Sequence, residues 1–327
     1  MEIARLSETK RDFAPIFLFA ATLFLSASLM FVLQPMFGKV LLPLLGGAAS
    51  VWNTCMVFYQ SVLFFGYLYA HVLSSFCSHS RQIMIHGALL TASLVFLPIG
   101  MPEGSVPPVD GDPTAWLLTT LLVSIGLPFF VLSTTSPLLQ KWFSSIGHET
   151  SHDPYYLSIA SNAGSLLALM SYPFLLESQI GLFNQRQYWS VGFLLLCGVI
   201  LLCMYVYKRQ GTAADSIPET RQKTGLQENP GWALKLHWLV LSFVPSNLLL
   251  GTTNYISIDI ASVPLLWVIP LALYLISFII VFSRYSGAVH KWMLYEVNAK
   301  LEKPVNFLAN WRQNKGIRRD VSGAYLL

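Results

Sequence analysis

Residues 13–33 read FAPIFLFAATLFLSASLMFVL, a run of 21 residues that contains no charged side chain. A helix needs about 20 mostly apolar residues to cross the hydrocarbon core of a bilayer. Ser26, Ala27 and Ser28 resemble the small residues of a signal-peptide cleavage site. The apolar stretch nevertheless continues to Leu33, which makes it longer than the roughly 7–15 apolar residues of a signal core. This stretch is therefore predicted to be an uncleaved membrane span.

The composition extends this prediction to the whole chain. Of the 327 residues, 54% are hydrophobic and 11% are charged, whereas soluble domains carry about 25% charged residues. A net charge of +4 over 327 residues does not provide a basic face that could bind the phosphates of a nucleic acid. No nucleic-acid partner is therefore expected. The four cysteines show no paired spacing and are interpreted as small buried hydrophobic residues. We expect an integral membrane protein whose main partner is the lipid bilayer.

Seven further stretches pass the same length test. The eight predicted spans are 13–33, 51–73, 83–101, 115–137, 155–176, 188–207, 234–254 and 260–283. With the N-terminus inside, eight crossings leave only Lys39 and Arg186 of the 20 basic residues outside, as the positive-inside rule requires. The predicted fold is an all-α, multi-pass transmembrane bundle that is major-facilitator-like, with both termini cytoplasmic. The expected location is the bacterial cytoplasmic (inner) membrane.

Two polar regions flank the last two predicted spans. Residues 208–232 are predicted to be a cytoplasmic loop inside the bundle region 1–283, and residues 284–327 a cytoplasmic tail with a net charge of +5. The tail favours either a basic amphipathic helix on the inner leaflet or a solvated segment. Five tryptophans stand at or beside span ends and predict an interfacial aromatic belt. They are Trp52, Trp116, Trp142, Trp189 and Trp232.

The sequence motifs point away from catalysis. Residues 148–152 spell H-E-x-x-H, but this zinc-protease signature needs a helix, and here it precedes Asp153-Pro154, in which proline disfavours helix. Cys77 and His79 are too few for a zinc site, which needs four ligands. The chain contains neither a P-loop nor a G-x-G-x-x-G motif. We therefore expect no catalytic residues, no metal, no cofactor and no enzymatic activity.

Polar residues inside or beside the predicted spans are the candidates for a solute pathway, because such residues are costly in a membrane. The candidates are Gln34, Lys39, Asn53, Gln60, Asn162 and Asp259. Gln34 and Lys39 lie in a Gly/Pro-broken segment after the first span, and Lys39 is a possible partner of Asp259. Asn53 and Gln60 are seven residues apart and share one helix face. The alternative interpretation is that these groups only cap helices or hold the bundle together.

Several stretches resemble a known family. They are LQPMFGKVLLPLLGGAASVWNTCMVFYQSVLFFGYLYAH (33–71), STTSPLLQKWF (133–143), DPYYLSIASNAGSLLALMSYPFLLE (153–177) and TTNYISIDIASVPLLWVIPLALYLISFIIVF (252–282). They look like the membrane half of fused proteins that join a major-facilitator-like bundle to a spermidine-synthase-like domain. The resemblance implies a multi-pass bundle that precedes an aminopropyltransferase-like or methyltransferase-like domain. That catalytic half has no counterpart in these 327 residues, so no catalytic residue is carried over.

Three functional expectations follow. The first is a transporter-like membrane module for a small polar or charged solute. The second is a membrane anchor or scaffold for a separately encoded cytosolic enzyme of the polyamine-synthase or methyltransferase type. The third is that the chain is the truncated N-terminal half of such a fused enzyme.

Overall fold

The fold is taken from a computed structural model. It describes residues 2–45, 49–102, 104–108, 112–146, 157–214, 231–255 and 268–283, and single positions at 287, 289, 291–293 and 295. These residues form helices and short connections without a β-strand, so the predicted all-α class is confirmed for this part of the chain. The chain divides into two compact units, residues 1–279 and 280–327.

Ten α-helices, two 3₁₀ turns and two π turns make up the described structure. The first half contains α1 (Glu2–Leu41), η1 (Leu42–Leu45), α2 (Ala49–Phe76), α3 (His79–Ser93), η2 (Leu94–Phe96), α4 (Thr114–Leu121), η3 (Leu122–Gly126) and α5 (Leu127–Ser144). The second half contains α6 (Leu157–Ser171), η6 (Tyr172–Leu176), α7 (Glu177–Gln179), α8 (Leu182–Ala214), α9 (Trp232–Tyr255) and α10 (Val268–Phe282).

Six helical segments among the described residues are long and apolar enough to cross a membrane. They are Ala14–Leu45, Ser50–Phe76, Thr114–Ser144, Leu157–Gln179, Leu182–Arg209 and Trp232–Thr253. The predicted spans 83–101 and 260–283 correspond to α3 and α10, which have 15 residues each. At 15 residues, α3 is about 22 Å long, short of the roughly 30 Å hydrocarbon core, whereas residues 260–267 of the other predicted span lie outside the described residues. Eight crossings and the orientation of the termini therefore stay predictions.

α1 is longer and more regular than the sequence suggested. In the segment expected to be broken by Gly and Pro after the first span, the α-helix continues through Pro35 and Gly38 to Leu41, and a 3₁₀ turn that contains Pro43 follows at Leu42–Leu45. Pro35 removes one backbone donor, which neighbouring helices compensate in a bundle. Gly38 lets Trp52 of α2 approach closely, since a Cβ at this position would lie 2.9 Å from the Trp52 ring. Gly38, one of the residues that suggested a break in the helix, is therefore a point of close packing between α1 and α2.

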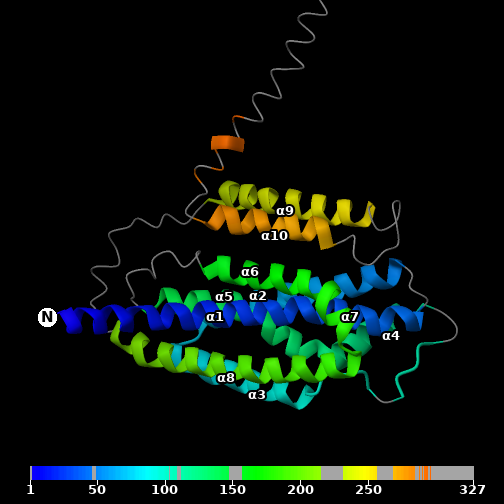
Figure 1. The fold of residues 1–327 in the computed structure, drawn as a ribbon, viewed down its shortest axis with the longest axis horizontal. Helices are drawn as coiled ribbons and strands as arrows, with labels where there is room; N and C mark the ends of the chain where they lie inside the picture. Colours follow the sequence, from blue (N-terminus) through cyan, green and yellow to red (C-terminus); the bar gives the residue numbers. More distant parts are fainter. Residues whose placement is uncertain are drawn as a thin grey trace, which may run out of the picture. The chain divides into compact units, whose positions relative to one another are not determined.

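α1 is the central helix of the bundle, and its main neighbours are α6, α8 and α5 (Figure 1). It crosses α6 at Gly164, where an added Cβ would overlap the Phe24 carbonyl oxygen. Ser28 donates a hydrogen bond to the Gly164 carbonyl across the same crossing, at 3.2 Å. Small residues of this kind let two backbones approach within a membrane. The small residues around Gly164, on the predicted fifth span, thus form a helix contact.

Two of the five tryptophans are core residues, so the belt prediction is wrong for them. Trp142 and Trp189 are buried. The indole of Trp189 donates to the Leu29 carbonyl of α1 at 2.8 Å, and that of Trp142 donates to Gln82 of α3 at 2.9 Å. A buried indole N–H needs such a partner. Their positions at span ends in the sequence did not reveal these contacts.

Two membrane-length helices contain a π turn. In the first, η3 lies between α4 and α5 and precedes Pro128. In the second, η6 separates α6 from α7 and contains Pro173. Proline removes a backbone donor, and π turns recur at functional sites. In each of these two helices a π turn therefore accompanies a proline.

Candidate functional site

An ion pair joins the C-terminal end of α1 to α7. Lys39 Nζ lies 3.3 Å from Glu177 Oε1, and the two side chains are 38% and 40% exposed. Glu177 directly follows η6, so the π turn leads into this contact. Sequence reasoning missed Glu177 and paired Lys39 with Asp259, which lies outside the described residues. Lys39 therefore has a charged partner in the chain that is different from the expected one.

A second group of polar side chains lies where α5 meets α6, and we call it the α5–α6 polar cluster. It consists of Ser136, Gln140, Ser158 and Asn162, all half-buried. The Gln140 amide donates to Ser136 Oγ at 3.1 Å and to Ser158 Oγ at 3.4 Å. Asn162 Nδ2 donates to the Ser158 carbonyl at 2.8 Å. The cluster thus joins one predicted candidate, Asn162, to three residues that were not singled out.

The two polar groups lie toward opposite ends of one continuous helical segment. Asn162 is near the start of α6 and Glu177 follows η6, 15 positions later in the sequence. At 1.5 Å per residue, this separation is about 22 Å along the helix. The stretch between them contains the π turn η6 and its Pro173. The segment Leu157–Gln179 therefore carries a polar contact on each side of its irregular turn.

The other predicted candidates have different surroundings. Gln34 is buried on α1, and its backbone carbonyl accepts a hydrogen bond from the Tyr59 hydroxyl at 3.5 Å. Asn53 and Gln60 share one face of α2, as predicted, and both are exposed. They point outward from the bundle. The structure therefore does not place Asn53 and Gln60 with the two polar contacts of α6.

A buried cluster of aromatic and polar side chains was missed by sequence reasoning. Gln82 accepts hydrogen bonds from Trp142 at 2.9 Å and from Tyr207 at 3.4 Å. One helical turn away, His86 Nδ1 lies 3.3 Å from the Tyr69 hydroxyl. The available signal was a glutamine and a histidine four residues apart at the start of a predicted span. These contacts join α3 to α2, α5 and α8, which favours a structural role.

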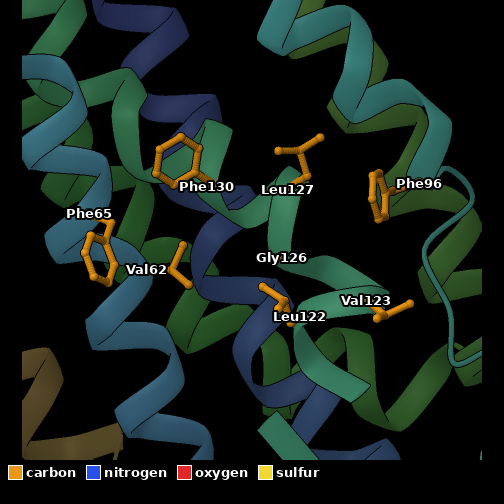
Figure 2. A pocket seen from close by; sticks show the side chains of 8 residues that line it. All are labelled: Val62, Phe65, Phe96, Leu122, Val123, Gly126, Leu127 and Phe130. Atoms are coloured by element: carbon orange, nitrogen blue, oxygen red, sulfur yellow. The ribbon is translucent and has the colours of Figure 1, made fainter. Parts of the chain in front are cut away.

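A pocket of about 550 Å³ opens beside η3 (Figure 2). Its lining comes from α2, η2 and the η3–α5 segment, and consists of Val62, Phe65, Phe96, Leu122, Val123, Gly126, Leu127 and Phe130. None of these side chains donates or accepts a hydrogen bond. The pocket therefore suits an apolar occupant and does not serve as a polar-solute site.

Metal chemistry finds no support in the described residues, in which no three His, Cys, Asp or Glu side chains form a group able to hold an ion. The H-E-x-x-H sequence at 148–152 lies outside these residues. The four cysteines are free, and Cys55, Cys197 and Cys203 are buried as expected. Comparisons with protein-family models, curated proteins and solved structures found no match to this chain.

Proposed function

We propose that this chain is a transporter-like membrane module for a small polar or charged solute. The observation that supports it is the segment Leu157–Gln179, which has an ion pair on one side of a π turn and a half-buried polar cluster on the other. π turns inside helices recur at functional sites. Polar side chains inside a bundle are functional candidates by default.

In this proposal the α5–α6 polar cluster binds the solute. The Gln140 and Asn162 amides offer donors and acceptors, and the Ser136 and Ser158 hydroxyls offer both as well. Without solute, these groups bond to one another or to their own helix. Exchanging these hydrogen bonds for bonds to a solute leaves few polar groups unsatisfied, which keeps the cost of binding low.

The Lys39–Glu177 pair is proposed as a gate. Both side chains are more than one third exposed, and exposed pairs of this kind contribute only about 0–1 kcal/mol. Such a pair breaks at little cost when α1 and α7 separate. η6 supplies an irregular turn next to Glu177 at which this separation can occur.

The test is a thermal-unfolding screen of the purified chain in lipid nanodiscs with amino acids, sugars and polyamines. A solute that raises the midpoint temperature is then tested on Asn162→Leu and Gln140→Leu. The matched control is Asn247→Leu on α9, because Asn247 bonds to the carbonyl four residues earlier at 2.9 Å, as Asn162 does. We expect stabilisation to vanish in the first two variants and to persist in the control. Equal stabilisation of all three variants would contradict the proposed site.

Uptake into proteoliposomes tests the Lys39–Glu177 gate. It also tests Asp259, which the structure does not describe. Lys39→Glu is expected to impair uptake of the stabilising solute, and adding Glu177→Lys to restore it. Asp259→Asn is expected to abolish uptake if Asp259 lies on the pathway. Normal uptake by Lys39→Glu alone would remove the gate from the proposal.

An anchor or scaffold for a cytosolic enzyme is the second candidate function. It is favoured by α9, an apolar helix whose side chains are exposed along nearly its whole length, and by the basic tail 284–327. The test is co-purification of an aminopropyltransferase or methyltransferase activity with the chain, with and without residues 284–327. Loss of that activity on deletion supports the anchor, and its absence from both preparations contradicts it.

A further inference from the structure

The outward face of α2 carries a regular stripe, which we call the α2 stripe. It consists of Asn53, Val57, Gln60, Phe64, Tyr67 and His71, all of which are exposed. The spacings alternate between four and three residues, which is the pattern of a helix–helix seam. From Asn53 to His71 the stripe is about 27 Å long, close to the roughly 30 Å of the hydrocarbon core. It therefore runs across most of the bilayer.

Polar side chains at and beside the α2 stripe differ in their hydrogen bonding. The hydroxyls of Thr54 and Ser61 donate to carbonyls of their own helix at 3.0 and 2.7 Å. The carboxamides of Asn53 and Gln60 make no hydrogen bond to the part of the chain that the structure describes. Gln60 lies ten residues from the nearer end of the span Ser50–Phe76. Lipid tails offer no hydrogen-bond partner there, so an amide at this position favours association with another helix.

We propose that the α2 stripe is a dimer interface that binds the same stripe of a second copy of this chain. A parallel pair around a two-fold axis places each stripe residue opposite its own counterpart. A carboxamide has both donors and an acceptor, so Asn53 and Gln60 each pair with their copies. The stripe has no Lys, Arg, Asp or Glu that would repel its copy.

The opposite face of α2 is already used within the chain. Gly66 packs so closely on α5 that an added Cβ would lie 2.8 Å from Ser133 Cβ. Cys55 and Tyr59 on this inward side are buried. A second copy can therefore bind the stripe without displacing a contact of the bundle. The dimer does not depend on the transport function proposed above.

The experiment is cysteine cross-linking of the full chain in proteoliposomes. All variants carry Cys77→Ser, because the other three native cysteines are buried. Val57→Cys and Phe64→Cys place a thiol on the stripe, and Leu195→Cys places one on an exposed position of α8 as a control. We expect covalent dimers, of twice the 36.5 kDa chain mass, from the two stripe variants and not from the control. Equal dimer yields at all three positions would indicate random collision and overturn the proposal.

The amides are tested by measuring dimerisation with fluorescently labelled chains diluted in lipid. Two interhelical hydrogen bonds of the size measured in membranes predict about eightfold weaker dimerisation for Asn53→Leu/Gln60→Leu. If this double variant does not elute as a folded protein, Gln60→Ala removes one of the two amide pairs and is expected to weaken dimerisation about threefold. Undiminished dimerisation contradicts the pairing of amides. Failure of both stripe variants to form covalent dimers also overturns the second copy as the occupant of the stripe.

Discussion

Gly164→Ala tests how closely the bundle is packed around α1. A Cβ at position 164 would overlap the Phe24 carbonyl oxygen, and it would lie 3.0 Å from Ser28 Oγ and 3.1 Å from the Phe24 carbonyl carbon. Favourable contacts between carbon atoms lie at about 3.5–4.0 Å. Because two of these obstacles are backbone atoms, rotation of a side chain cannot relieve them. α1 and α6 must therefore move apart.

The size of the effect follows from two opposing contributions. Overpacking a core costs about 1–3 kcal/mol, and replacing Gly by Ala inside a helix returns up to about 1 kcal/mol. We expect a net loss of about 1–2 kcal/mol, since the overpacking lies against backbone. At about 2–4 °C per kcal/mol, the unfolding midpoint is expected to fall by about 5 °C.

The matched control is Gly198→Ala on α8, where an added Cβ meets no atom within 4 Å. This variant gains the helix propensity without the collision, so its midpoint is expected to stay constant or rise. Both variants are measured by thermal unfolding in the same nanodiscs. A Gly164→Ala midpoint equal to that of Gly198→Ala would refute the close α1–α6 crossing.

Three further predictions concern other contacts. Gly66→Ala is expected to lower the unfolding midpoint by a similar amount, and adding Ser133→Gly is expected to restore most of it, because Ser133 provides the colliding atoms. Trp142→Phe removes the indole donor from a buried glutamine amide of α3, at an expected cost of about 1–3 kcal/mol in unfolding free energy. Hydrogen bonds from the hydroxyl and the backbone N–H of Thr114 lower the pKa of Asp112. The stabilisation of the α4 start is thus present above the ordinary aspartate pKa and is lost as pH falls through the lowered value. The protection of the Thr114 amide against hydrogen exchange, relative to an unprotected amide at the same pH, should fall with this loss. In the variant Asp112→Asn this protection should no longer depend on pH.

The sequence was sufficient for features that depend on local pattern. Long apolar runs predict the helices, because a bilayer requires a minimum length. The seven-residue spacing of Asn53 and Gln60 predicts one shared face, and both lie on the outer face of α2. The cysteines in apolar runs are free, and three of the four are buried.

Features that depend on distant residues were not predictable in this way. Lys39 and Glu177 are 138 positions apart, and no local pattern relates them. Trp189 stands at a span end in the sequence, yet the neighbouring α1 buries it and accepts its N–H. Pro35 favours a break locally, while α1 continues through it. In each case a neighbouring helix determines the outcome.

The π turn η3 has a consequence for how this chain can vary. One residue corresponds to about 100° of rotation and 1.5 Å of rise in an α-helix, and a π turn holds an additional residue. Deleting one residue from 122–126 would remove the additional residue and convert the π turn to α-helix, which leaves the inward face of α5, with Ser133 and Trp142, close to its present rotation relative to α4. Exchanges among apolar residues at exposed positions such as Leu122 also leave the rotation of α5 relative to α4 unchanged. Homologous chains are therefore expected to differ here in residue type and by the presence or absence of one residue, while the inward face of α5 is kept.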